Sequence, residues 1–542
     1  MNGRHRRLIR LAAPAAWRPL RTFDVLLVVL VAVVVIGSGS FLSFNSSDGA
    51  GTPATAGTQP SATGTPLKDT GAPAPTRVCG NDTVLGGGPG SAPRGAVVVP
   101  AGLDSSVDFS QPDTTYWFAP GTHTLGSGQY MQIVPGNGSS FIGAPGAVLD
   151  GRHENNYAFG GYARDVTISY LTIKDFGAHG GNQNQGAVNN DSGTGWKISH
   201  STITSNAGAG VMLGSNDTLT YDCLMDNEEY GFSAYAPGGV AGLVLEHNEI
   251  TGNDTYNYEV RYPGCGCSGG GKFWDVNGAV VTGNWVHDNT NVGLWADTDN
   301  RGFDISGNNI SGNTSYGLIY EISYNALISH NTFERNGLVE GPKNSSFPVS
   351  AIYISESGGD PSVRGPYSGK LSITENSFLD NWSGVVLWEN SNRFCGSPAN
   401  TSTGACTLGH SSITLRSCGA RNLAHQPYYA ECRWETRNVL VQRNLFSFKP
   451  SSVAANCTPV NGCGLQGLFS EYGTYPSWSP YKGTAVPEHI TFDQDNRFTG
   501  NEYVGPWEFM VYQQGNLVTW SKWISKPYRQ DHGSFLTDAS ER

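Results

Sequence analysis

Charged side chains are scarce in this sequence, because Asp, Glu, Lys and Arg together make up only 14% of its 542 residues. A mainly helical protein uses more Glu, Lys and Ala than this chain contains, so the shortage argues against a helical fold. Glycine is abundant instead, at 71 residues, and aromatic residues reach 11%. Many short strands joined by tight turns use glycine in this way. The composition favours an all-β protein.

Positive charge is also in short supply outside the N-terminus. The formal net charge is −12, although the first 21 residues alone hold six arginines, so the rest of the chain is more acidic still. Nucleic-acid binding requires a basic surface. We therefore expect no nucleic-acid partner.

Long apolar runs are missing except for one near the N-terminus. Residues 25–36 are wholly apolar. A less hydrophobic stretch up to residue 44 extends this run to about 20 residues, which is enough to cross a bilayer. The basic segment 1–22 predicts a cytoplasmic N-terminus and export of the rest. We predict a transmembrane signal-anchor over 23–44, which makes this a single-pass protein of the cell membrane. The alternative is a cleaved signal peptide and secretion, but no small-residue cleavage site follows the apolar core closely.

The segment 45–76 contains almost no large apolar residue and is rich in Pro, Gly, Ser and Thr. Such a segment cannot bury a core, so it predicts a flexible linker between the membrane and an external domain. We expect that domain to cover residues 77–535, followed by a tail over 536–542.

The cysteines agree with export, because there are ten of them, an even number. Six lie in a loop-rich region, 392–463, and three pairs are close enough for local disulfides, although the sequence leaves the connectivity open: Cys395/Cys406, Cys418/Cys432 and Cys457/Cys463. Cys265 and Cys267 are compatible with a metal pair, a redox pair or a disulfide. No further His or Cys follows them at zinc-like spacing, which favours disulfides over metal.

Self-similarity is the strongest signal in the sequence. Seven segments align without gaps, at 198–203, 219–224, 245–250, 281–286, 305–310, 328–333 and 373–378. Five of them have Asn at the fourth place, and all seven have Asn five residues after it: Asn206, Asn227, Asn253, Asn289, Asn313, Asn336 and Asn381. Asn tolerates left-handed backbone and suits a sharp corner. Stacked units would place equivalent asparagines in a ladder.

The period of about 21 to 26 residues, where no insertion intervenes, holds two or three short alternating strands per unit. A leucine-rich repeat has a similar period but needs a Leu-x-x-Leu-x-Leu pattern, which this chain lacks, and a propeller blade needs about 40 residues. A parallel β-helix, a solenoid of stacked coils, is the better interpretation.

Several motifs resemble the right-handed parallel β-helix proteins of the pectate-lyase-like superfamily, and especially a bacterial exported group of undefined activity. The similar stretches are 280–289, 293–299 and 317–324, together with Trp520-Ser-Lys-Trp523 and Gln530-Asp-His-Gly533 near the end. The resemblance covers roughly residues 95–535. It implies the fold, and for activity only a range: polysaccharide lyases, glycoside hydrolases, epimerases and non-catalytic adhesins.

A further strand follows the second Asn of the repeat, in segments such as 293–297, 317–321, 351–355 and 384–388. The second and fourth positions are apolar or small and face inward, so the third and fifth face out, because strand side chains alternate. The outward column holds Trp295, Ile319, Tyr353 and Val386 beside Asp297, Glu321, Ser355 and Trp388. Aromatic and apolar residues on a solvent face, among acids, predict a floor for a sugar chain, with Trp295, Tyr353 and Trp388 stacking on the rings.

Asp297 and Glu321 occupy the same position on adjacent coils. Strand spacing of about 4.8 Å would bring their carboxylates to about 5 Å. The pKa of one of them should then rise, which gives an acid beside a base or nucleophile, as in a retaining glycosidase. Together with Asp299 the same acids could instead hold Ca²⁺, the one cofactor that we consider; otherwise Asp299 would bind substrate hydroxyls.

Lys272 lies in a long insertion, 256–274, and is the candidate catalytic cation of a lyase. The resemblance implies a Glu-Ala-Gly-Gly-x-Lys-like stretch here, but Cys267 stands where the Glu would be. The Gly run before Lys272 lacks the spacing of a phosphate loop.

Each candidate also has a structural interpretation. Acids at strand ends often cap backbone amides, and Lys272 would be an ordinary solvated loop lysine. The recurring His200, His247 and His330 predict a surface stack, whereas the His287-Asp288 pair is a better catalytic candidate. Glu356 and Glu389 lie one place beyond the outward column, so their facing is open.

Two functions follow from these residues. The first is a membrane-anchored, monomeric enzyme that acts outside the cytoplasm on a polysaccharide or cell-wall glycan, as a hydrolase or lyase, with catalytic Asp297, Glu321 and Lys272. The second is a non-catalytic carbohydrate-binding or adhesive solenoid. Long insertions at 256–274, 338–350 and 392–436 favour the enzyme, because insertions in repeat proteins tend to gather on one face and flank a binding site.

Overall fold

The computed structural model describes residues 71–190, 193–344, 347–399, 413–471, 473–483 and 485–537. Within these ranges no helix is both long and apolar enough to span a bilayer. The predicted anchor at 23–44, the basic segment 1–22 and most of the predicted linker lie outside the described residues, so these predictions stay open.

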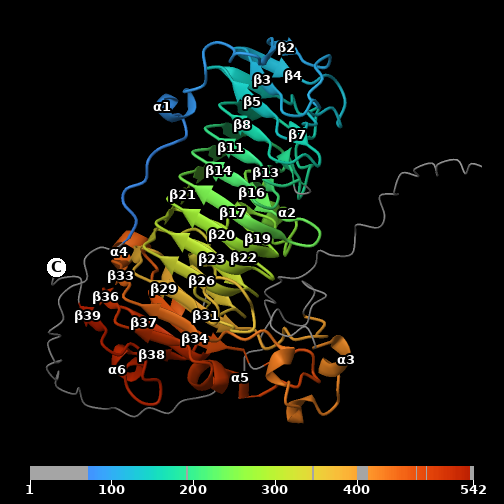
Figure 1. The fold of residues 1–542 in the computed structure, drawn as a ribbon. Coiled ribbons are helices and arrows are strands. Elements are labelled where there is room, and N and C mark those ends of the chain that lie inside the picture. The colour runs from blue at the N-terminus through green and yellow to red at the C-terminus, as the bar shows by residue number, and fades with distance from the viewer. Residues whose placement is uncertain are drawn as a thin grey trace, which may run out of the picture.

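The described chain winds into a solenoid of three long sheets, which run side by side along its axis (Figure 1). Sheet A contains β1 (Val97–Val99), β3 (Thr115–Phe118), β5 (Ser140–Gly143), β8 (Thr167–Ser169), β11 (Lys197–Ser199), β14 (Thr218–Thr220), β17 (Val240–Glu246), β20 (Val276–Thr282), β23 (Arg301–Ser306), β26 (Tyr324–Ser329), β29 (Leu371–Thr374), β32 (Val439–Gln442) and β35 (Arg497–Thr499). Sheet B contains β2 (Gly102–Leu103), β4 (Gly121–Thr124), β6 (Ala147–Asp150), β9 (Thr172–Lys174), β12 (Thr202–Thr204), β15 (Cys223–Met225), β18 (Glu249–Thr251), β21 (Trp285–His287), β24 (Asn309–Ser311), β27 (Thr332–Glu334), β30 (Ser377–Leu379), β33 (Leu445–Ser447), β36 (Glu502–Val504) and β39 (Phe535–Thr537). Sheet C contains β7 (Phe159–Gly160), β10 (Gly186–Asn189), β13 (Ala209–Leu213), β16 (Tyr230–Ala234), β19 (Gly269–Trp274), β22 (Leu294–Asp297), β25 (Leu318–Glu321), β28 (Ser350–Ser355), β31 (Ser383–Glu389), β34 (Leu465–Ser470), β37 (Glu508–Gln513) and β38 (Leu517–Val518). Neighbouring strands are parallel except for β37 and β38.

Helices are short and lie in the connections. They are α1 (Asp82–Leu85), α2 (Tyr258–Arg261), α3 (Leu415–Cys418), α4 (Pro450–Val453), α5 (Ala485–Glu488) and α6 (Trp520–Trp523), with 3-10 turns at Gly341–Lys343, Leu423–His425, Ala430–Cys432 and Pro459–Asn461 and a π-turn at His489–Asp493. The composition therefore predicts the all-β class correctly.

The repeated asparagines form two buried hydrogen-bonded ladders, as the period predicts. In the second ladder the Asn313 side-chain amide donates to Asn336 Oδ1 (2.9 Å) and to the Val286 carbonyl (3.2 Å). Its own Oδ1 accepts from the backbone and side-chain amides of Asn289 (3.2 and 3.0 Å). The first ladder continues past the aligned segments through Asn444 and Asn501.

The left-handed residue of each corner is not the ladder asparagine but the residue before it. His247 (φ 57°) precedes Asn248, and Asp288 (φ 53°) precedes Asn289. The expectation that Asn supplies the left-handed backbone is therefore wrong. Asn is required for its amide, which satisfies buried backbone groups of neighbouring coils.

Two of the three recurring histidines, His200 and His247, lie in a surface stack as expected, whereas His330 does not. The rings of Tyr170, His200, Tyr221 and His247 lie on one another with centroid distances of 5.0, 5.3 and 5.0 Å. His330 lies further along, where its Nε2 pairs with Glu375 (2.9 Å).

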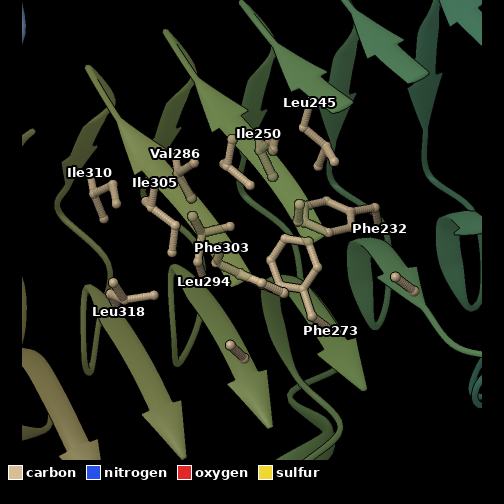
Figure 2. Close-up of a cluster of buried hydrophobic side chains, with 14 of the residues drawn as sticks. Phe232, Leu245, Ile250, Phe273, Val286, Leu294, Phe303, Ile305, Ile310 and Leu318 are labelled. Atoms are coloured by element: carbon tan, nitrogen blue, oxygen red, sulfur yellow. The ribbon is translucent and has the colours of Figure 1, made fainter. Parts of the chain in front are cut away.

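The core fills the inside of the coils with stacked apolar residues, one to three from most strands. Figure 2 shows Phe232, Phe273 and Phe303 of successive coils beside Leu294 and Leu318. Adjacent phenylalanine rings meet edge to face with centroids 5.1 Å apart, a favoured geometry for aromatic pairs. This inner packing fixes which side chains must point outward.

An N-terminal strap, residues 71–88, runs back along the outside of the solenoid against the direction of the coils (Figure 1). The amide of Gly71 donates to Ser377, and the carbonyl of Val84 lies 3.0 Å from His200 Nδ1. Between these points the amides of Val78 and Cys79 donate to the Glu249 carboxylate (2.6 and 2.8 Å). The last residues of the predicted flexible linker thus lie against the solenoid.

The disulfides agree with the expected oxidised state. Cys418–Cys432 and Cys457–Cys463 are paired as predicted, and Cys265–Cys267 form a disulfide rather than a metal site. Cys395 is disulfide-bonded too, but its predicted partner Cys406 lies outside the described residues. Cys79–Cys223 joins the strap to β15 across 144 residues, a separation too large for sequence spacing to reveal.

Loss of the strap disulfide is the first testable change. We expect the Cys79→Ser/Cys223→Ser variant to lose about 2–5 kcal/mol of unfolding free energy, because the bond constrains a long loop of the unfolded chain. Trypsin should also cut faster after the exposed Arg77. Chemical denaturation and timed proteolysis measure both effects. The local Cys418→Ser/Cys432→Ser variant is the control, and equal tryptic half-lives at Arg77 would contradict the role of the strap.

Candidate functional site

The outer face of sheet C carries the predicted site. β22 and β25 pair in the predicted register, which puts Asp297 opposite Glu321 and Trp295 opposite Ile319. The next strands continue these two rows with Ser355 and Tyr353 on β28. Their neighbours along each strand, such as Leu294 and Ala296, belong to the inner core. The predicted alternation of inward and outward residues is correct.

The outer row is covered, however, and not a solvent face. Trp295, Ile319, Tyr353 and Val386 form a second apolar cluster, and Trp295 and Tyr353 are only 9% and 8% exposed. Rings from the connections pack on them: Tyr316 lies 5.2 Å and Phe347 6.0 Å from Tyr353, centroid to centroid. The prediction of a solvent-exposed row is therefore wrong, because strand alternation shows which side a residue faces but not which segments cover that side.

Trp388 lies at the edge of this second cluster and is half-buried. Its ring stacks on Tyr353 with centroids 6.0 Å apart and meets Phe347 edge to face at 5.4 Å. The indole N–H groups of Trp295 and Trp388 are buried and have no hydrogen-bond partner among the described residues. Each could donate to a ligand oxygen.

Lys272 is a strand residue and not part of a solvated loop. It lies on β19, where it pairs with Trp295 in the outward row, and its side chain is buried. Its Nζ pairs with Asp297 Oδ2 (2.9 Å), donates to the Gly266 carbonyl, and lies 4.3 Å from the Trp295 ring centroid. The strand escaped sequence alignment because Gly271 takes the inward apolar position. Phe232 fills that space, since a Cβ on Gly271 would come within 2.1 Å of its ring.

Glu321 forms an ion pair with Arg393. The Arg393 guanidinium donates to Glu321 Oε1 and also to Glu356 Oε2 (3.1 Å). Asp297 therefore interacts with a cation on the β19 side, and Glu321 with one beside Glu356. Because Asp297 and Glu321 pair with different cations on opposite sides, the arrangement favours separate chemical roles for the two carboxylates.

Glu356 is the carboxyl of this constellation whose pKa is raised. Complete burial raises the pKa to about 7, Arg393 opposes the rise, and Glu321 adds to it. Ser355 Oγ and the Asn390 amide donate to its two oxygens (2.9 and 2.7 Å). The sequence left the facing of Glu356 open; in the structure its side chain is fully buried, and Arg393 bridges it to Glu321.

Neither Asp297 nor Glu321 accepts a hydrogen bond from a described backbone amide. The Thr298 hydroxyl donates to Asp297 Oδ1 (2.8 Å), and the other contacts are the ion pairs above. The interpretation of these acids as strand-end caps is therefore not supported. Both are held by side chains.

Asp299 lies beyond the end of β22 in left-handed backbone (φ 60°), and its Oδ1 is buried without a partner in the described chain. Burial, with the nearby Asp275, raises its pKa to about 6. Across the described ranges no three His, Cys, Asp or Glu are placed to hold a metal ion. The calcium alternative therefore lacks a ligand set among these residues.

Residues 262–268, which contain the Cys265–Cys267 disulfide, form a loop over Lys272. The Gly266 carbonyl accepts from Lys272 and from the Tyr230 hydroxyl (3.0 Å). The Glu259 carboxylate accepts from the amides of Gly264 and Gly266 (2.6 and 3.1 Å). Gly266 has φ 58°, and a Cβ there would lie 3.0 Å from the Trp295 ring. We call residues 262–268 the disulfide loop.

His287 belongs to another face. It lies on β21 of sheet B, where Nε2 is 3.2 Å from Glu249, the residue that holds the strap, and Nδ1 is 2.8 Å from Asp288. This position removes the reason for a catalytic role at the Asp297 site. Glu389 is likewise structural, because it pairs with Arg433 (2.7 Å) and fixes the second end of the long insertion.

Arg393 and the disulfide loop are the parts of the site that the sequence analysis missed. Arg393 follows the start of the insertion that was expected to flank the site, 72 residues from Glu321. A lone arginine in a loop gives no periodic signal. Gly266 between two cysteines was visible, but only the fold brings it onto Lys272.

Comparison with known proteins agrees with the fold. Residues 186–365 match the family model of the right handed beta helix region. Together with the three sheets, this match confirms the predicted right-handed parallel β-helix, the architecture of the pectate-lyase-like superfamily that the repeat resembles.

Similar solved structures include a mannuronan C-5 epimerase A-module from Azotobacter vinelandii, at 15% identity over 54% of this chain and 81% of that one, with a TM-score of 0.39. A periplasmic alginate epimerase (10%, 66% and 72%, TM-score 0.32) and a pectate lyase (14%, 52% and 68%, TM-score 0.29) are also similar. No curated protein matches the sequence significantly. At such identities and TM-scores the resemblances say nothing about the activity of this chain.

The buried acids give the folded state a definite pH dependence. Burial is the main cause that raises the pKa of Asp217 and Asp299 to about 6 and of Asp254 and Glu356 to about 7. The folded protein therefore binds these protons more tightly than the unfolded chain. Their stabilising contribution is complete below the unfolded values near 4 and is lost as the pH rises through 6 to 7.

We expect the thermal midpoint to fall between about pH 5 and pH 8. The Glu356→Gln variant should reduce this slope, because it removes one of the titrating groups. Calorimetry at several pH values measures it. A midpoint that rises over this range would contradict the assignment.

Proposed function

We propose that this protein acts on a polysaccharide at the outer face of sheet C, as a hydrolase or lyase, with Asp297 and Glu321 as the reacting carboxylates. One observation carries the proposal: two carboxylates in register on adjacent coils are buried, and each is paired with its own cation, Lys272 or Arg393. They lie beside an aromatic row that has unpartnered indole N–H groups.

Folding alone gives no reason for these charges. Burying an ion pair costs about as much as the pair returns, and apolar residues of similar volume are often more stabilising. The same row contains Ser355 and Trp388 on the next two coils, so neutral residues fit it. Charged side chains that stay buried at such a cost in stability indicate a catalytic or binding site.

The residues divide naturally between reaction and binding. Asp297 and Glu321, each paired with a different cation, supply a base and an acid. Lys272 and Arg393 orient these two carboxylates. Trp295, Tyr353 and Trp388 supply aromatic faces for sugar rings, and Asp299 an oxygen for a hydroxyl. Both cations are already engaged by carboxylates, which leaves neither of them to neutralise a uronate. This favours hydrolysis over elimination.

A polysaccharide panel tests the proposal. The purified protein is incubated with neutral, amino-sugar and uronate polymers, while reducing-sugar release and the absorbance of unsaturated products are followed together. Reducing ends without absorbance indicate hydrolysis, and absorbance indicates elimination. Binding without turnover on every polymer would favour the second function, a non-catalytic carbohydrate-binding or adhesive solenoid.

We also propose that the protein is held at the cell membrane by residues 23–44, with the solenoid outside the cytoplasm. Disulfides support the external location, because they persist in oxidising compartments. Cell fractionation tests the anchor: the intact chain should sediment with membranes and resist extraction by salt. Recovery of a shortened chain in the medium would indicate a cleaved signal peptide instead.

A further inference from the structure

The Cys265–Cys267 disulfide adds little to the stability of the fold. Its two cysteines are only two residues apart, whereas the other pairs joined within the described chain are separated by 6, 14 and 144 residues. The stabilisation by a disulfide grows with the length of the loop that it closes in the unfolded chain. A bond across one intervening residue constrains that chain least. Its main effect is therefore on the conformation of the folded loop.

The residue between the two cysteines is the one that contacts Lys272. Gly266 lies in left-handed backbone (φ 58°), and its carbonyl accepts from Lys272 Nζ. A Cβ on Gly266 would lie 3.0 Å from the Trp295 ring, so the backbone of the disulfide loop lies directly on that ring. Lys272 and Trp295 are only 7% and 9% exposed. The disulfide thus fixes a residue that covers both side chains.

The two sulfur atoms of this disulfide have different surroundings. Cys267 is buried, and Gln183 Nε2 donates to its Sγ (3.4 Å). Cys265 is half-buried, and Glu259 Oε2 lies 3.6 Å from its Sγ. A hydrogen-bond donor stabilises a thiolate, whereas a nearby carboxylate destabilises one. An external thiol therefore has access to Cys265, and Cys267 is the better leaving group.

We propose that Cys265–Cys267 is a site of thiol–disulfide exchange with an external dithiol, and that its reduction releases the disulfide loop from Lys272. A thiolate of the dithiol attacks Cys265 Sγ, the S–S bond breaks, and Cys267 leaves as a thiolate that takes up a proton. The other thiol of the reagent attacks the mixed disulfide and frees Cys265. The protein gains two electrons and two protons, and the dithiol becomes a disulfide. The exchange depends on the contacts of the loop and not on the proposed function.

A comparison with Cys457–Cys463 tests the exchange, because Cys457 is half-buried as well. The amide of Cys463 donates to the Thr458 carbonyl (3.0 Å), which keeps these two thiols close after reduction. The amide of Cys267, in contrast, donates to Cys265 Sγ itself (3.2 Å). We expect Cys265–Cys267 to be reduced at a ratio of reduced to oxidised dithiothreitol about tenfold lower or more.

Peptide mapping of the folded protein measures this ratio. The protein is equilibrated with graded mixtures of reduced and oxidised dithiothreitol, and free thiols are blocked before digestion. Trypsin cuts after Arg261 and Lys272, so both cysteines of the loop and the lysine lie in one peptide. Reduction of both disulfides at the same ratio, or of Cys265–Cys267 only when the protein unfolds, would overturn the exchange site.

Lysine acetylation measures the release of the loop. An acetyl ester reacts with exposed amines, so Lys272 should react slowly in the oxidised protein. After reduction it should react about tenfold faster, the effect of losing one hydrogen bond to a charged group. The exposed Lys197 is the internal reference, and its rate should stay the same. Slow acetylation of Lys272 in the reduced and folded protein would overturn the release.

Two variants separate the disulfide from other effects of the reductant. Cys265→Ser/Cys267→Ser should be acetylated at Lys272 as fast as the reduced protein, with or without dithiothreitol. Cys457→Ser/Cys463→Ser is the matched control and should keep Lys272 slow until the loop disulfide is reduced. Thermal midpoints verify that both variants are folded. A folded Cys265→Ser/Cys267→Ser variant with a slow Lys272 would mean that other contacts hold the loop, and the proposal would be wrong. Absence of turnover on every polymer would overturn the proposed function but leave this inference standing.

Discussion

Replacement of Asp297 by Asn, or of Glu321 by Gln, is expected to lower turnover by about 10²–10⁴-fold, the usual contribution of a general acid or base. The amide keeps the shape of the side chain and one acceptor oxygen for Lys272 or Arg393, but it can neither accept a proton as a base nor donate one as an acid. Initial rates on the substrate found by the panel measure the effect.

Each of these variants leaves a buried cation without its charge partner, which by itself destabilises a protein. The thermal midpoint must therefore be measured beside the rate, and rates compared well below it. Glu246→Gln is the control, since Glu246 points outward from β17 on sheet A. If both Asp297→Asn and Glu321→Gln turn over like the wild type, these carboxylates are not the reacting groups.

Loss of one ladder asparagine should have a large effect on stability. Asn313→Ala removes two hydrogen bonds that its side-chain amide donates and two that its Oδ1 accepts. The backbone amide of Asn289 then loses its side-chain acceptor and the carbonyl of Val286 loses a donor, whereas the side-chain amide of Asn289 keeps the Ile250 carbonyl. Each unsatisfied buried group costs about 1–3 kcal/mol, so we expect a loss of about 2–4 kcal/mol.

Denaturant unfolding measures this loss, and Asn309→Ala is the matched control. Asn309 lies four residues earlier, on the outer side of β24, where a surface substitution should change the stability by about 0.5 kcal/mol or less. Similar losses for the two variants would mean that the ladder contributes little beyond packing.

The repeat predicts the fold and the register well because both depend on local periodicity. The spacing of Asn289 and Asn313 fixes one coil against the next, and that register puts Asp297 opposite Glu321. Inward and outward sides follow from strand alternation alone. Information of this kind is present in every coil, so a single sequence is enough to find it.

The environment of the site could not be predicted in the same way, because insertions build it. Arg393 reaches Glu321 from 72 residues away, and the carbonyl of Gly266 reaches Lys272 through a disulfide loop. Neither contact repeats along the chain. The expectation of a solvent-exposed acid pair is wrong for this reason, because periodicity indicates which side of a strand faces outward but not which segments cover that side.

The strap sets the path of a pulling force that is applied at its first described residue. Gly71 lies beside Ser377, far along the axis from β1. Tension applied at Gly71 reaches Cys79 and passes through the disulfide to Cys223 on β15. Residues 80–222 form a closed loop outside this path and carry none of the tension while the bond is intact. The first coils, whose edge residues Val98 and Leu103 are exposed, are thereby protected from being peeled away.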